Sequence, residues 1–271
     1  FLRYLSITNL RDFASTTARY ANQIGHKEGK NFRECSNPDC LNKDQHRKRC
    51  TDFLGVSAES ILVFLGCLII MGAAGHRSCY QAWRSITGCI LIQQAMSRRA
   101  FEQHFRFLHF IGSSTIPQGC TDRLFKVRPL LDILKASFIR NYDHGDLLTL
   151  DESMIKFKGN LAYKQYIPSK PIKHGIKVFC LVSAYTSYLF NFHVYTGKED
   201  TGGLPFVFWL LQHRLLLDSM LHVGCVIFMD SWFTSVNLAM SLFEQFRIFV
   251  VGVVRSQRSR EKKERDFPFN N

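Results

Sequence analysis

Apolar residues in the first half of the chain recur at the spacing of α-helices. A long apolar run, Ile61–Met71, follows Ser57 and Ser60, which have the spacing of a helix cap. A segment this apolar predicts a helix in the centre of a core. Helical periodicity is also present at residues 1–26, 97–110 and 129–142. We therefore expect an N-terminal helical domain over residues 1–145.

The pattern changes to that of β-strands after residue 145. Short apolar runs bounded by turn residues predict strands, and two longer segments predict helices. The strands are expected at 146–157, 175–184, 188–195, 223–229 and 248–254, and the helices at about 205–217 and 234–245. This β-β-β-α-β-α-β order is that of a ribonuclease H-like mixed sheet, in which the first strand pairs with the fourth. We expect such a sheet, incomplete, over residues 146–256, with a basic tail at 257–271.

Two of the apolar runs in the predicted strands lead directly into an aspartate. Asp151 follows the apolar run Leu147–Leu150, and Asp230 follows Val223–Met229. Ligand sites commonly form at the carboxyl ends of neighbouring strands, so we expect the two carboxylates within about 8 Å of each other. Carboxylate oxygens suit Mg²⁺ or Mn²⁺, which predicts a divalent metal site. The alternative is an edge strand with a solvated aspartate.

The charge balance favours a polyanionic partner. Lys and Arg number 35 against 22 Asp and Glu, giving a net charge of +13. Cations beside phosphate bind double-stranded DNA without reading its sequence, and we expect Lys156 and Lys158 to share one face of the strand that leaves Asp151. The expected phosphate contacts are Lys156, Lys158, Lys170, Lys173, Lys177 and Arg255. The alternative is that these residues keep a sheet edge soluble.

The length of the apolar runs and the placement of the cysteines bear on a membrane partner and on the cellular compartment. The longest uncharged apolar run, Ile61–Ala74, is too short to span a bilayer, so we expect no membrane partner. We also expect no small-molecule cofactor. The nine cysteines lie mostly in apolar runs, where a free cysteine behaves as a small hydrophobe, and this favours a reducing compartment.

Two motifs could each form a binding site or have an ordinary structural role. Cys35, Cys40, His46 and Cys50 have the ligand order of a zinc knuckle, but the first pair is spaced more widely than structural zinc sites use. An ordinary exposed loop is the favoured interpretation. Trp232 and Phe233 could stack on a base, although packing under the following helix is favoured.

Several of these segments resemble piggyBac-type transposases. LDESMIKFKGN, YKQYIPSKPIKHGIKVF and MDSWFTSVNLAMSLF are similar to the catalytic region, and AESILVFLGCLIIMG and MSRRAFEQHFRFLHF are similar to the helical DNA-binding and dimerisation region. The resemblance implies that Asp151 and Asp230 are two of three catalytic, metal-binding aspartates. The third lies in the family after an inserted subdomain, past the end of this sequence. We therefore expect metal binding without strand cleavage from these residues.

The resemblance also implies a function and a location. A complete family member cuts and joins DNA with divalent metal and inserts at TTAA, in the nucleus, and a homodimer is a candidate assembly. The alternative is a domesticated, non-catalytic DNA-binding or chromatin-associated protein that retains the fold. A structural remnant without retained activity is the third hypothesis.

Overall fold

The computed structural model describes residues 3–30, 55–76, 78–112, 117–143, 145–216 and 224–254. The chain forms two compact units, residues 1–134 and 135–271. This division falls inside a helix, and each unit is described by itself below. The cysteine and histidine positions between 35 and 50, and Arg255, lie outside the described residues.

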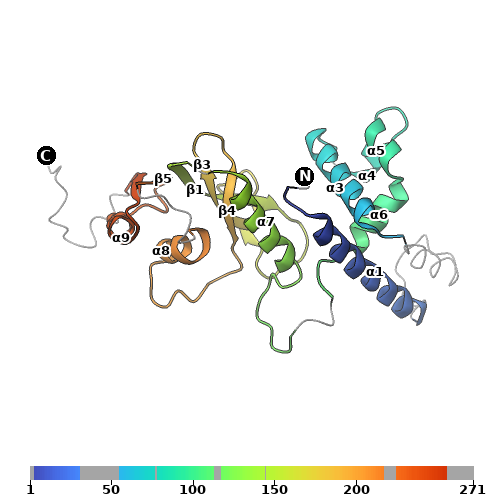
Figure 1. The fold of residues 1–271 in the computed structure, drawn as a ribbon, viewed down its shortest axis with the longest axis horizontal. Helices are drawn as coiled ribbons and strands as arrows, with labels where there is room; N and C mark the ends of the chain where they lie inside the picture. The colour runs from blue at the N-terminus through green and yellow to red at the C-terminus, as the bar shows by residue number, and fades with distance from the viewer. Residues whose placement is uncertain are drawn as a thin grey trace. The chain divides into compact units, whose positions relative to one another are not determined.

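The first unit is helical, as the periodicity predicts (Figure 1). Its helices are α1 (Ile7–Lys30), α3 (Ala58–Ala73), α4 (Cys79–Ala82), α5 (Ile90–Ala95), α6 (Arg98–Phe107) and the first turns of α7 (Arg128–Asn141). Helix α3 begins at a capping box: the Ser60 N–H donates to Ser57 Oγ over 3.2 Å, and the Ser57 N–H donates to Ser60 Oγ over 3.0 Å. This reciprocal cap satisfies two backbone donors that the helix itself cannot pair.

Helix α3 supplies the centre of the core of the first unit. Phe64 and Cys67 pack with Phe101 of α6, while Ile61 packs with Phe13 of α1. The side chains of these residues are almost fully buried. A helix that is apolar on most of its surface is stable in water only when neighbouring helices cover it, which is the arrangement observed.

The second unit contains a six-stranded mixed sheet. Its strands are β1 (Leu147–Lys156), β2 (Gln165–Tyr166), β3 (His174–Ser183), β4 (Leu189–Val194), β5 (Val226–Met229) and β6 (Phe249–Gly252). They run in the order β2-β3-β1-β5-β6, and β4 also pairs with β3. Strand β1 is antiparallel to β3 and parallel to β5. The predicted pairing of the first apolar strand with the Asp230 strand is therefore confirmed.

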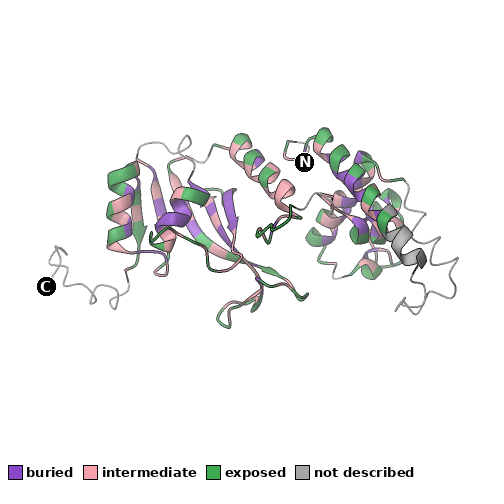
Figure 2. Cartoon of the chain, turned by 90° about the horizontal axis from the view of Figure 1, so that it is seen from below, coloured by how far each residue is buried: buried purple, intermediate pink, exposed green. Residues whose placement is uncertain are grey.

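Helices α8 (Phe206–Leu210) and α9 (Val236–Phe246) contribute to the core of the second unit, and α8 continues into a π-helical turn, η3 (Leu211–Leu215). Buried residues of β1, β3 and β5 pack with residues of all three. Figure 2 colours the buried parts of the strands and helices purple. The sheet core includes Leu148, Leu150, Leu181 and Ile227, each at most 1% exposed. Among the described helices, none combines the length and the apolar character that crossing a bilayer requires.

Candidate functional site

The first aspartate lies inside a strand and not at its end. Asp151 is the fifth residue of β1, which continues to Lys156 because β3 keeps pairing with it as far as Gly175. The expected position at the carboxyl end of a strand is therefore wrong for Asp151. The end of the apolar run at Leu150 marks the end of the parallel ladder with β5, where the sheet core stops, and not the end of β1.

The second aspartate follows its strand directly, as predicted. Asp230 comes after Met229, the last residue of β5, and its Oδ1 accepts hydrogen bonds from the N–H groups of Trp232 at 2.8 Å and Phe233 at 3.2 Å. The buried Thr234 hydroxyl donates to the Asp230 carbonyl oxygen over 2.8 Å. These bonds fix the turn that joins β5 to α9, and with it the place of the carboxylate.

The strand register brings the two aspartates to neighbouring positions. Leu150 is paired with Met229, so Asp151 and Asp230 are the next residues on two adjacent strands, which lie about 4.8 Å apart in a sheet. Both side chains are exposed. Asp151 also lies opposite Cys180 on β3, where burial first and the charge of Asp151 second raise the pKa of the thiol to about 11.

The donor chemistry of this pair fits a hard divalent cation. Two adjacent, exposed carboxylates can supply oxygen ligands to Mg²⁺ or Mn²⁺, which keep several waters in such sites. Within the described parts of the chain, no group of three or more His, Cys, Asp or Glu residues is arranged to hold a metal. The roles of Asp151 and Asp230 as metal ligands stay predictions.

Two of the predicted lysines lie close to the aspartates. Lys170 Nζ forms a 3.0 Å ion pair with Glu152 Oε1. That hydrogen bond, with smaller effects from Asp151 and Asp230, raises the pKa of Lys170. Burial lowers the pKa of Lys177, and the charges of the same three carboxylates oppose this effect. Both ammonium groups therefore experience the field of the aspartate pair.

The remaining predicted cations lie elsewhere. Lys156 is five residues beyond Asp151, about 17 Å along an extended strand, and Lys173 directly precedes β3 at the same end of the β1–β3 pair. The expectation that Lys156 and Lys158 share a strand face is wrong, because β1 ends at Lys156. Arg255 lies outside the described residues. The sequence spacing of the lysines did not separate these two groups.

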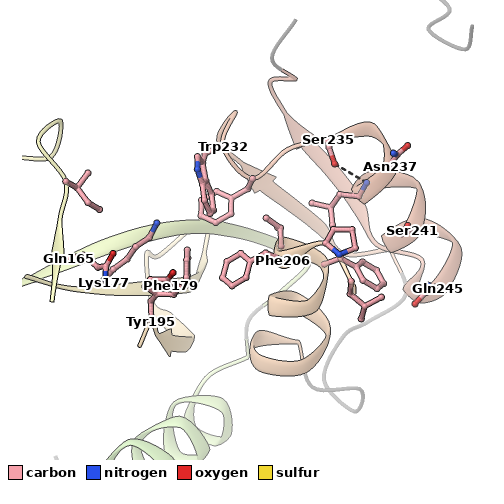
Figure 3. A pocket seen from close by; sticks show the side chains of 17 residues that line it. Gln165, Lys177, Phe179, Tyr195, Phe206, Trp232, Ser235, Asn237, Ser241 and Gln245 are labelled. Carbon is pink, nitrogen blue, oxygen red and sulfur yellow. Dashed lines mark hydrogen bonds between the residues drawn. The ribbon is translucent and has the colours of Figure 1, made fainter. Parts of the chain in front are cut away.

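A cavity of about 900 Å³ adjoins the site (Figure 3). Its lining includes Lys177, Phe179, Tyr195, Phe206, Trp232 and Asn237. Phe233 is 1% exposed and belongs to the sheet core, which confirms the packing interpretation for this residue. The half-buried Trp232 packs against that core and also lines the cavity, so its role in stacking on a base stays a prediction. Neither the cavity nor the contact of Glu152 with Lys170 was predicted. The cavity is lined by residues of β3, α8 and α9 that are distant in the sequence, and the contact depends on the path of the loop before β3.

Known proteins share the sequence pattern and the fold of this chain. A family model described as Transposase IS4 matches residues 11–267. The human PiggyBac transposable element-derived protein 2 is 28% identical over 218 residues, covering 76% of this chain and 35% of the relative. The human PiggyBac transposable element-derived protein 3 is 28% identical over 148 residues, covering 54% of this chain and 24% of the relative. The chain thus spans about a third or less of the length of these relatives.

A solved piggyBac transposase structure has a similar fold. The cryo-EM structure of a piggyBac transposase synaptic complex with hairpin DNA matches with a TM-score of 0.73 and 24% sequence identity, over 96% of this chain and 54% of that chain. Since the family model covers almost the whole chain and these similar proteins are all of the piggyBac type, the chain belongs to the Transposase IS4 family as a relative of the piggyBac transposases.

Proposed function

We propose that this chain binds double-stranded DNA over the β1–β3 side of its sheet and presents a backbone phosphate to a divalent metal held by Asp151 and Asp230. The observation that carries the proposal is the parallel register between β1 and β5, which makes the two carboxylates neighbours. The matching piggyBac transposase complex contains hairpin DNA, which supports DNA as the ligand class. A nuclear location and a homodimeric assembly belong to the same proposal and rest on the resemblance to piggyBac-type transposases.

The aspartates and the lysines of the site would have different roles. Asp151 and Asp230 would hold the metal, Mg²⁺ or Mn²⁺, and Lys170 and Lys177 would neutralise the phosphate oxygens beside it. When bound, a divalent ion supplies Lewis-acid polarisation of the phosphate and lowers the pKa of an attacking water. The turn at Trp232–Thr234 keeps the Asp230 carboxylate in place, which matters because small displacements of a reacting group cost rate.

A Mn²⁺ titration tests the metal site. We expect the chain to bind Mn²⁺ weakly, and Asp151→Asn or Asp230→Asn to weaken binding at least tenfold, because each removes a charged oxygen ligand. Asp146→Asn is the matched control, since Asp146 is an exposed aspartate directly before β1. Equal Mn²⁺ affinity of the wild type and both site variants would rule out the shared metal site.

A nicking assay tests whether these 271 residues cleave DNA by themselves. We expect no Mn²⁺-dependent cleavage of labelled transposon-end DNA by these 271 residues, because the described residues contain no third metal ligand near the pair. Nicking that disappears in both asparagine variants would show that another acid completes the site.

A further inference from the structure

Glu152 is the most deeply buried acid near the aspartate pair. It follows Asp151 on β1, so its side chain projects from the opposite face of the strand, the face that carries Leu150 and Phe179. The Glu152 side chain is 13% exposed, and its Oε2 is buried without a hydrogen-bond partner among the described residues. Burying a carboxylate costs free energy unless a paired positive charge compensates for the lost hydration, so Glu152 requires a cationic partner.

Lys170 is the direct partner of Glu152. The ion pair of 3.0 Å joins β1 to the loop that precedes β3, and the Lys170 side chain keeps 34% of its surface exposed. The Lys170 ammonium is thus held at one point while part of the side chain remains open to a ligand. Exposed lysines without such an anchor sample many rotamers, and ordering them costs conformational entropy.

Lys177 is held by two aromatic rings, those of Phe179 and Trp232. Its ammonium lies 4.7 Å from the ring centroid of Phe179 and 4.6 Å from that of Trp232, and Figure 3 shows it beside these rings at the cavity wall. Two aromatic faces attract a cation that has lost part of its hydration. The charge of Glu152 is the largest effect that opposes the loss of the Lys177 proton.

We propose that Glu152 is a positioning residue, which anchors the ammonium group of Lys170 and faces Lys177 from the same side of the β1–β3 pair. The two cations then form a preformed cradle for a DNA backbone phosphate near Asp230, whose Oδ1 accepts from the N–H of the Trp232 that packs against Lys177. The inference rests on the proposed function, because it assumes that DNA reaches the aspartate pair. Glu152 contacts neither metal nor DNA in this arrangement and acts through the two lysines. Cations ordered before the ligand arrives lose less entropy on binding, which favours affinity.

The sign of one mutational effect distinguishes positioning from simple charge. Glu152 carries a negative charge, so charge alone predicts that Glu152→Gln tightens binding to DNA. Positioning predicts the opposite: we expect Glu152→Gln to weaken binding to a short labelled duplex of random sequence roughly threefold to tenfold, measured with Ca²⁺ present to neutralise the aspartate pair. The control is Glu244→Gln, which removes an exposed carboxylate on α9 and is expected to leave affinity unchanged or slightly higher.

The lysine variants show which hypothesis fails. We expect Lys170→Met and Lys177→Met each to weaken binding by about tenfold and to reduce the salt slope by about one, and Glu152→Gln to add no further loss when both lysines are replaced. Wild-type affinity in both lysine variants would refute the proposed DNA site itself. Weaker binding in the lysine variants with unchanged or tighter binding in Glu152→Gln would overturn the positioning role alone.

Acetylation by acetic anhydride, followed by mass spectrometry, keeps the test independent of folding. Loss of the Glu152 carboxylate removes an effect that raises the pKa of Lys170 and of Lys177, so the Glu152→Gln variant should show faster acetylation at these two lysines, with a lysine of the first unit such as Lys126 unchanged. Acetylation at Lys170 that does not change in Glu152→Gln would contradict the anchoring contact. Faster acetylation at every lysine would mean that Glu152 supports the fold as a whole, which also overturns the proposal.

Discussion

At the residue scale, the sequence predicts the two aspartates but not Glu152, the residue that pairs with Lys170. Asp151 and Asp230 each follow an apolar run, and this signal survives in the structure because the runs are the paired parts of β1 and β5. Glu152 gives no such signal. Its burial follows from the alternation of side chains along β1 and from a loop that returns Lys170 to it, and neither can be read from local spacing.

The hydroxyl of Thr234 provides a test of how firmly the second aspartate is held. Thr234 is 3% exposed, and its Oγ1 donates to the carbonyl oxygen of Asp230 over 2.8 Å. We expect Thr234→Val, which keeps the shape and removes the donor, to lower the free energy of unfolding by about 1 kcal/mol. We also expect it to weaken Mn²⁺ binding roughly threefold to tenfold, because the turn that carries Asp230 becomes less constrained.

Chemical denaturation and a Mn²⁺ titration measure these two effects separately. Thr234→Ser retains the donor and is the matched control for metal binding. Mn²⁺ affinity that is unchanged in Thr234→Val would show that this hydrogen bond stabilises the fold without positioning the carboxylate.

At the element scale, the segments that supply several residues to a core are predicted from their apolar runs. These include the helix α3 and the strands β1, β3 and β5. The short helices α4 and α5 and the two-residue strand β2 were not predicted. Their places are fixed by tertiary contacts. Strand β1 is also longer than its apolar run, since β3 supplies backbone partners beyond the core.

The capping box of α3 predicts a measurable contribution to stability. Ser57 Oγ accepts from the Ser60 N–H, and the Ser60 hydroxyl lies 2.9 Å from Nε2 of the buried His104, which links the start of α3 to α6. We expect Ser57→Ala to lower the free energy of unfolding by about 1 kcal/mol, because a backbone donor of the first turn loses its acceptor.

Denaturant unfolding followed by circular dichroism checks this value. Ser57→Asp retains an acceptor and places a negative charge at the helix N-terminus, so it should unfold close to the wild type. Identical stability of Ser57→Ala and the wild type would mean that water replaces the cap without cost.

At the scale of the whole molecule, composition predicts a polyanionic partner but does not place the cations. The net charge of +13 is a property of the sequence, whereas the division of the lysines into two groups is a property of the β1–β3 pair. Lys170 and Lys177 lie in the field of the aspartates. Lys156 and Lys173 belong to the other end of the two strands. The fold is therefore more predictable from this sequence than the binding surface is.

A salt series on this second lysine group tests whether DNA extends over both ends of the strand pair. Each lysine that neutralises a phosphate adds about 0.9 to the slope of log affinity against log salt. We expect replacement of Lys156, Lys158 and Lys173 by alanine together to reduce the slope for a random duplex by between two and three. We also expect Mn²⁺ affinity to stay unchanged, because Lys156 lies about 17 Å along β1 from Asp151 and Lys173 directly precedes β3 at the same end of the strand pair. A slope equal to that of the wild type would show that these three lysines are solvated and keep the sheet edge soluble. A reduced slope would extend the DNA surface from the aspartate pair along β1 and β3, where strand geometry and not local sequence brings the two groups of cations onto one ligand.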